Sequence, residues 1–258
     1  MPRDRTGVSS GAAHRLRAGW ILLLLVGNAV LGLGAWAWLH IPDSHVWQFV
    51  LSVLSALLLL VIFLWMYTKS IVVARESGIR SPRWASCTWL LAGILIAHIW
   101  MRVVGGLADN IEKRAGYWNS QLSVHMRTVF TYPRLVEYQD IVITMLSWFL
   151  PLLLLPLVIE LVTRNWNRGV IRESARVLLR WQYWLVAIVT LIAGFKLTST
   201  LVDWHPAYTV RGELISVALR LALAYGLDIL LGCVVLAVTC ELLSQASLGE
   251  GFPRNPTP

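Results

Sequence analysis

Five polar side chains lie within or beside long apolar stretches, where they could form a site inside a membrane. An ionisable residue at the centre of a bilayer costs about 2.5–3.5 kcal/mol on insertion scales, so each one is a candidate for function. Asp228 and Lys196 fall at matching depth in two consecutive apolar stretches, and we expect them to form a buried ion pair. His98 has a similar depth, Arg102 follows it by one helical turn, and Tyr225 shares a helical face with Asp228. The sequence therefore predicts an outer-leaflet polar pocket lined by these five residues.

Two uses of this pocket stay open at the level of sequence. Lys196 and Asp228 could be a structural pair that holds two helices together, with the long lysine side chain reaching toward the interface. Alternatively, the pocket could bind a ligand or carry protons. We favour the structural pair.

A second set of charges recurs every four residues along one segment. On a helix of 3.6 residues per turn, steps of four advance by about 40°, so these side chains form a slowly winding stripe. Such a segment can lie in the inner headgroup plane, where its guanidinium groups contact anionic lipid or dock a cytoplasmic protein partner. The alternative is a solvated basic loop that only sets topology. The stripe consists of Arg164, Arg168, Arg172, Arg176 and Arg180.

Motifs of catalytic chemistry are absent from the sequence. No HExxH, GxSxG, P-loop, DxD or CxxC pattern occurs, and the histidines do not take the facing intramembrane positions that haem ligation needs. Cys87, Cys233 and Cys240 fall in or beside apolar stretches and have no metal-binding spacing, so we expect buried, reduced thiols. We predict no catalytic residues, no metal and no cofactor.

The elements that must position these residues follow from composition. Hydrophobic residues make up 57% of the 258 residues and charged residues 14%, compared with about 25% charged residues in soluble domains. Apolar blocks have the length of about 20 residues that crosses a bilayer. We therefore predict an all-α, polytopic integral membrane protein with six transmembrane helices, at about 19–39, 46–67, 84–104, 141–162, 181–201 and 219–243.

Three smaller expectations concern the flanks and connections of these spans. Residues 1–17 and 244–258 read as disordered tails, and the first span is long for a signal peptide although Ala35-Trp36-Ala37 resembles a cleavage site. Gly27, Asn28, Gly32 and Gly34 give the first span a small face for helix packing. The longest connection, 105–138, opens with two glycines and is expected to hold short interfacial helices.

Orientation follows from the placement of basic residues, which give the chain a net charge of +8. Arginines and lysines concentrate in the N-terminal tail and in two basic hinges, 69–83 and 164–180, rather than in the other connections. The positive-inside rule then puts both termini in the cytoplasm of a bacterial inner membrane. Because this rule accounts for the charge, we do not expect a nucleic-acid partner.

The two hinges resemble one another. Arg75-Glu76-Ser77 precedes Arg83-Trp84 at the interval at which Arg172-Glu173-Ser174 precedes Arg180-Trp181. The offset superposes the second span on the fourth and the third on the fifth, which favours a tandem repeat of a helical hairpin over chance similarity.

Two classes of function are compatible with these features. The first is a non-catalytic membrane component, an assembly factor or accessory subunit, with anionic lipid and a protein partner at the hinges. The alternative is a small carrier of a lipid-like or anionic solute that uses the outer pocket. Substrate dependence of an Asp228→Asn variant would separate the two classes.

Overall fold

A computed structural model describes residues 18–42, 44–75, 84–166, 168–202 and 210–248, and this part of the chain is helical without strands. Six of its helices are long and apolar enough to cross a membrane, which agrees with the predicted multi-pass architecture. The helices are α2 (Ala18–Leu39), α3 (Val46–Arg75), α4 (Trp84–Gln121), α5 (Val124–Val129), α6 (Tyr132–Arg164), α7 (Arg168–Leu178), α8 (Trp181–Val202) and α9 (Val210–Leu248).

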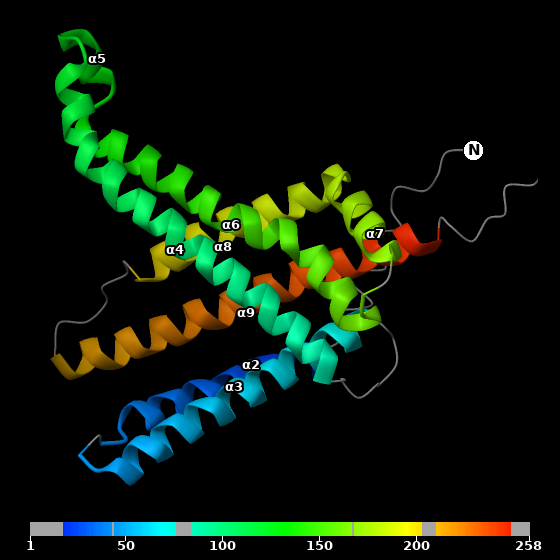
Figure 1. Ribbon diagram of the computed structural model, residues 1–258. Coiled ribbons are helices and arrows are strands. Elements are labelled where there is room, and N and C mark those ends of the chain that lie inside the picture. Colours follow the sequence, from blue (N-terminus) through cyan, green and yellow to red (C-terminus); the bar gives the residue numbers. More distant parts are fainter. Residues whose placement is uncertain (1–17, 43, 76–83, 167, 203–209, 249–258) are drawn as a thin grey trace, which may run out of the picture.

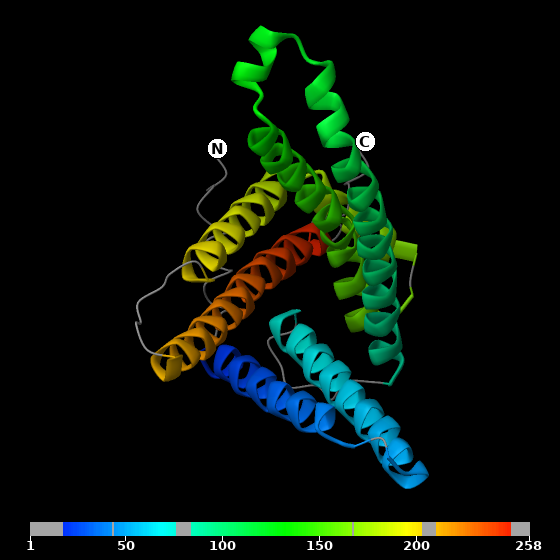
Figure 2. The same ribbon diagram turned by 90° about the vertical axis from the view of Figure 1, so that its left-hand side faces the viewer.

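The long helices form three antiparallel pairs. Helix α2 packs along α3, α4 along α6, and α8 along α9. The pairs meet at the end of the bundle where α3 and α6 finish, α4 and α8 begin, and α7 lies; we call this the hinge end. From there the α4–α6 pair diverges from the α2–α3 pair toward the opposite end (Figure 1; Figure 2 gives the view from that opposite end).

The buried core lies at the hinge end. Its side chains come from the last turns of α3, α6 and α9 and from α7, and they include Ala74, Ile159, Val177, Leu242 and Leu243. Cys87, Cys233 and Cys240 are buried and form no disulfide among the described residues, in line with the thiols predicted. Toward the opposite end the long helices expose large apolar side chains, as lipid-facing helices do.

Glycines allow close helix contacts at several crossings. An added Cβ on Gly27 would lie 2.2 Å from the Met66 sulfur, and one on Gly34 would lie 2.7 Å from Leu59, so α2 rests closely on α3. This confirms the packing role predicted for Gly27 and Gly34, whereas Gly32 has nothing within 4 Å of an added Cβ. On α4, an added Cβ on Gly93 would lie 2.6 Å from Val158 of α6.

Proline in the middle of α6 is accommodated by a neighbouring helix. Pro151 and Pro156 both lie inside α6. Pro156 has no N–H, which frees the carbonyl of Leu152 one turn earlier. The hydroxyl of the buried Tyr183 on α8 donates to that carbonyl. The freed backbone acceptor is therefore satisfied inside the bundle, as a membrane requires.

The connection predicted at 105–138 is much shorter in the structure, although it does contain one of the expected short helices, α5. Helix α4 continues through Gly105 and Gly106 to Gln121, α5 follows after two residues, and α6 begins at Tyr132 rather than near residue 141. Neither glycine has positive φ, so nothing in the backbone requires a turn. Packing against α6, where Val104 is buried, outweighs the weak helix propensity of the glycine pair.

Helices α3 and α9 also extend beyond the predicted ends of their spans. Helix α3 runs to Arg75 rather than to residue 67, and α9 runs from Val210 to Leu248 rather than from 219 to 243. The tail boundary expected after residue 243 is therefore too early, because Ala246 is buried and Ser244 contacts Arg75. Expectations for residues 1–17, 76–83 and 249–258 concern parts of the chain outside the described residues.

The helix pairs differ from the units of the proposed repeat. The repeat joins the second span to the third and the fourth to the fifth through the hinges, whereas the extensive packing lies between α4 and α6 and between α8 and α9. Helices α4 and α8 do begin at the equivalent tryptophans, Trp84 and Trp181. The tandem repeat stays a prediction.

Candidate functional site

The structure does not assemble the predicted outer pocket. His98 and Arg102 lie on α4, Lys196 on α8, and Tyr225 and Asp228 on α9. Within the described residues, no hydrogen bond or ion pair joins any of the five to another. Asp228 accepts a hydrogen bond from Thr198 of α8 at 3.3 Å, and the Tyr225 hydroxyl donates to Asn28 of α2 at 3.0 Å.

The expected pair of Lys196 and Asp228 fails because the two side chains point in different directions. Helix α8 meets α9 at Gly194, where an added Cβ would lie 3.3 Å from Leu231 and 3.6 Å from Asp228 Oδ1. Lys196 follows Gly194 by two residues, about 200° around the helix, so it faces away from α9. Thr198 follows by four residues, faces α9, and is the residue that contacts Asp228.

His98 and Arg102 are turned away from the helix that packs on α4. Gly93, Trp100 and Val104 face α6, and the indole N–H of Trp100 donates to the Leu146 carbonyl at 2.9 Å. His98 follows Gly93 by five residues, about 140° around the helix, and both His98 and Arg102 are exposed. A ligand site needing all five predicted residues is not present in this arrangement.

An intramembrane polar cluster forms instead around Asn28. Its side-chain carbonyl oxygen accepts from the hydroxyls of Tyr67 and Tyr225, each at 3.0 Å, and its amide nitrogen donates to the Leu24 carbonyl at 2.8 Å. Asn28 is 2% exposed, so every hydrogen bond of this amide is made within the protein. The cluster joins α2, α3 and α9, and its chemistry is that of helix packing.

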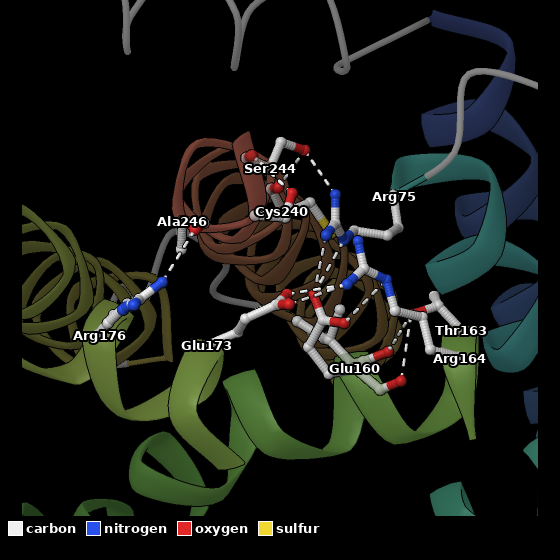
Figure 3. A network of polar contacts seen from close by, with 11 residues as sticks. Arg75, Glu160, Thr163, Arg164, Glu173, Arg176, Cys240, Ser244 and Ala246 are labelled. Atoms are coloured by element: carbon white, nitrogen blue, oxygen red, sulfur yellow. Dashed lines mark hydrogen bonds and ion pairs between the residues drawn. The ribbon is translucent and has the colours of Figure 1, made fainter. Parts of the chain in front are cut away.

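The main charged site of the structure lies at the hinge end (Figure 3). Arg75, the last residue of α3, donates to Glu160 Oε1 from Nη2 at 2.9 Å and from Nε at 3.2 Å, and to the Ser244 hydroxyl at 2.6 Å. Arg164 Nε lies 3.4 Å from Glu160 Oε2, and Arg164 Nη1 lies 2.9 Å from Glu173 Oε2. We call Arg75, Glu160, Arg164, Glu173 and Ser244 the hinge cluster.

The charged side chains of the hinge cluster differ in their exposure to solvent. The Glu160 side chain is 0% exposed and that of Arg75 is 8% exposed, whereas that of Arg164 is 41% exposed. Two arginines face two glutamates, so the cluster carries no excess charge. Such an arrangement is suited to holding helices together. Its carboxylates are paired with its guanidinium groups, and the Ser244 hydroxyl accepts from Arg75 and donates to the Cys240 carbonyl.

The arginine stripe is interrupted in the structure. Helix α6 ends at Arg164 because Asn165 takes a positive φ of 59°, a conformation that asparagine tolerates better than most residues. Helix α7 starts anew at Arg168, whose side chain lies outside the described residues, and Arg180 follows its end. The expected continuous stripe is therefore divided among two helices and a turn.

Several of these arginines are bound to the protein itself. Arg164 is in the hinge cluster, Arg176 donates to the Ala246 carbonyl at 3.3 Å, and Arg180 donates to the Gln245 side chain at 2.8 Å. Arg172 is exposed. Helix α7 packs one face against α6 and α9. The buried residues of this face have the i, i+3, i+4, i+7 spacing of an amphipathic helix and are Val170, Glu173, Ser174 and Val177.

Sequence reasoning missed the hinge cluster, although part of its signal was visible. Glu160 and Arg164 are four residues apart on one helix, which favours an ion pair. The contacts of Arg75 with Glu160 and Ser244 span 85 and 169 residues of sequence, and no local pattern predicts such pairs.

Neither metal ligands nor known relatives assign a role to this chain. Among the described residues, no group of three or more histidine, cysteine, aspartate or glutamate side chains could hold a metal ion. Comparison with protein families, curated proteins and solved structures finds nothing that matches this chain.

Proposed function

We propose that this protein is a non-catalytic, multi-pass membrane component that acts as an accessory or assembly subunit by binding another protein. The observation that carries the proposal is the helical hairpin formed by the end of α4, α5 and the start of α6. This hairpin extends beyond the apolar part of the spans and ends in an ordered tip, residues 117–132 (Figure 1).

The length of α4 exceeds what a bilayer needs. Its 38 residues are about 57 Å long at 1.5 Å per residue, whereas the hydrocarbon core is about 30 Å thick. The apolar span ends at Ala108, and the following segment contains Asp109, Glu112, Lys113 and Arg114. Residues 109–121 therefore add about 20 Å of helix outside the apolar region.

The tip is held by several polar contacts. Arg127 donates to the carbonyls of Ser120 and, at 2.9 Å, of Leu122, and so caps the end of α4. The Asn119 amide donates to the Phe130 carbonyl at 3.1 Å and ties α4 to the segment before α6. The Ser123 hydroxyl accepts from the backbone of Met126 at the start of α5. A tip closed in this way presents a defined surface.

Exposed apolar side chains on the tip support a protein partner. Tyr117, Trp118, Val124 and Tyr132 are all exposed, and Val124 is 80% exposed. Lipid explains similar exposure along the spans, but the tip lies beyond the charged segment of α4. Apolar groups gathered on a surface outside the bilayer are a frequent mark of protein contact.

We infer that the hinge end faces the cytoplasm of a bacterial inner membrane. The inference rests on the concentration of basic residues in the N-terminal tail and at the two hinges. The tip would then lie on the outer side. In this orientation Arg172 and its neighbours on α7 lie near the anionic inner headgroups, which is the place proposed for lipid contact.

The carrier alternative has less support. It needs polar groups that converge on a solute, and the five candidate residues lie on three helices with no hydrogen bond or ion pair between any two of them in the described part of the chain. A carrier in which a bound solute brings them together is the outcome that the following experiment would detect.

Photo-crosslinking from the tip tests the proposal. With p-benzoylphenylalanine at position 118, illumination of cells of the native host should give a covalent adduct with one protein of defined mass. The matched control places the same group at Trp148, which is exposed on α6 within the apolar span and should react with lipid only.

Purification in mild detergent supplies the second arm. A Tyr117→Ser, Trp118→Ser variant should lose the adducted protein at least about tenfold at unchanged abundance. Equal protein adducts from positions 118 and 148, or no protein adduct at all, would refute the accessory role. A stoichiometric lipid or small anion bound to wild type and lost in Lys196→Ala would establish the carrier instead.

A further inference from the structure

The side chains of Lys196 and Asp228 both need partners that the described chain does not supply. Both are exposed, and the structure gives Asp228 a single hydrogen bond, from Thr198, and the Lys196 ammonium none. A lysine can reach several ångströms toward an interface, but an aspartate is too short to do so. Asp228 lies well inside the apolar span that covers Ile215–Ser247, so contact with lipid tails is unfavourable.

The two charges lie at the same height in the bundle. Asp228 accepts from Thr198 and would lie 3.6 Å from a Cβ added to Gly194. Lys196 is between these two residues in sequence, so its Cα is level with Asp228. It points to the other side of α8, as described above.

The outward side of α8 carries an apolar seam that includes Lys196. Leu185, Val189, Ile192 and Lys196 are spaced by four, three and four residues, the spacing that forms a packing stripe between helices. The three apolar members are 50%, 58% and 50% exposed. This seam is directed away from α9.

Asp228 faces the side of α9 that lies between α8 and α2. Both α8 and α2 pack on α9, through Gly194 in the first case and through the contact of Asn28 with Tyr225 in the second. Asp228 is close to the α8 contact, and Tyr225, three residues earlier, makes the α2 contact. The carboxylate is therefore positioned for an additional helix that packs against α8, α9 and α2.

We propose that this surface binds a second copy of the chain, with Lys196 of each copy paired with Asp228 of the other. A two-fold axis along the membrane normal keeps every residue at its own depth, so two groups that are level within one chain are also level between copies. The α8 helix of each copy then lies against α8, α9 and α2 of the other, with its seam turned toward α2, and both ion pairs form in one isologous contact. Charge complementarity selects a second copy, because a different helix that neutralised Asp228 would leave Lys196 unmatched.

A charge exchange between differently tagged copies tests the proposal. Wild-type copies carrying two tags should co-purify from the membrane. Lys196→Asp alone places two carboxylates together and Asp228→Lys alone places two ammonium groups together, so each should lose co-purification at least about tenfold. Co-expression of Lys196→Asp with Asp228→Lys restores both opposite pairs between copies and should return co-purification to the wild-type level.

A matched control and a milder variant complete the test. His98→Asp puts an acid on the exposed side of α4 and should not restore co-purification with Asp228→Lys. If the charge variants fail to accumulate, Lys196→Leu and Asp228→Leu should accumulate normally and run as monomers in native mass spectrometry. Monomeric wild type, dimers unchanged in the leucine variants, or no restoration in the mixed pair would overturn the proposal.

Discussion

Glu160 is buried between two arginines that come from different parts of the chain. Arg75 ends α3 and Arg164 ends α6, and both approach the same carboxylate. Placing a carboxylate in a buried site is costly unless opposite charges and hydrogen bonds compensate it; here Arg75 hydrogen-bonds Oε1 and Arg164 forms an ion pair with Oε2. Glu160 therefore stabilises the hinge end through its contacts with Arg75 and Arg164, whereas its burial alone would be unfavourable.

Neutralising Glu160 should be strongly destabilising. Glu160→Gln leaves the Arg75 guanidinium, whose side chain is 8% exposed, without its counter-charge. We expect the free energy of unfolding to fall by about 3–5 kcal/mol. Titration of the purified protein with a denaturing detergent, followed by helical circular dichroism, measures this change.

The matched control is Glu137→Gln. Glu137 is on the same helix and exposed, so its substitution should change the free energy of unfolding by no more than about 0.5 kcal/mol. If the two variants were equally stable, the hinge cluster would not have the stabilising role inferred from its geometry.

At the scale of helices, the glycines of α4 have different structural roles that depend on their neighbours. Gly93 sits where α4 touches α6, whereas Gly105 and Gly106 have nothing within 4 Å of an added Cβ. The first glycine is needed for close approach, and the other two only reduce helix propensity.

Alanine substitutions at the glycines of α4 should therefore change the stability of the protein in different directions. Gly105→Ala and Gly106→Ala should each leave stability unchanged or raise it by up to about 1 kcal/mol, because alanine favours the helix. Gly93→Ala should lower it, since its Cβ would lie 2.6 Å from Val158. The same denaturing titration compares the three variants. A loss of stability in Gly105→Ala as large as in Gly93→Ala would contradict the continuous helix.

Sequence alone located all six spans because an uninterrupted run of about twenty apolar residues is typical of a transmembrane helix and of few other structures. It failed at the helix ends, where α4, α6 and α9 continue into polar sequence that hydropathy assigns to connections. It also failed for the pocket. Depth can be counted along a chain, but the direction of Lys196 depends on which side of α8 meets α9, and Gly194 reveals that contact only in three dimensions.

On the scale of the whole molecule, three helix pairs are held together at one end. The hinge cluster and the buried residues of α7 and α9 join them there, while the tip at residues 117–132 is remote from this core (Figure 2). Long-range pairs of this kind explain why the site at the hinge end could not be predicted although its individual arginines attracted attention in the sequence.

The two ends should label from opposite sides of the membrane. Thr128→Cys, at the tip, should react with a membrane-impermeant maleimide in intact spheroplasts, because the orientation we infer places the tip outside. Ile171→Cys, exposed on α7, should react only after permeabilisation. The native cysteines are buried and provide little background. The reverse labelling pattern would invert the proposed topology.

The long sequence separations in the hinge cluster have a consequence for biosynthesis. Arg75 leaves the ribosome 85 residues before Glu160 and 169 residues before Ser244, and Asn28 precedes Tyr225 by 197 residues. The Arg75 guanidinium therefore meets Glu160 when α6 is inserted, whereas its contact with Ser244 and the contact of Asn28 with Tyr225 form only with the last helix. A nascent chain that stalls before α9 lacks these last contacts and also the buried α9 residues of the core, Cys240, Leu242 and Leu243. Completion of synthesis and completion of folding thus coincide in the arrival of a single helix.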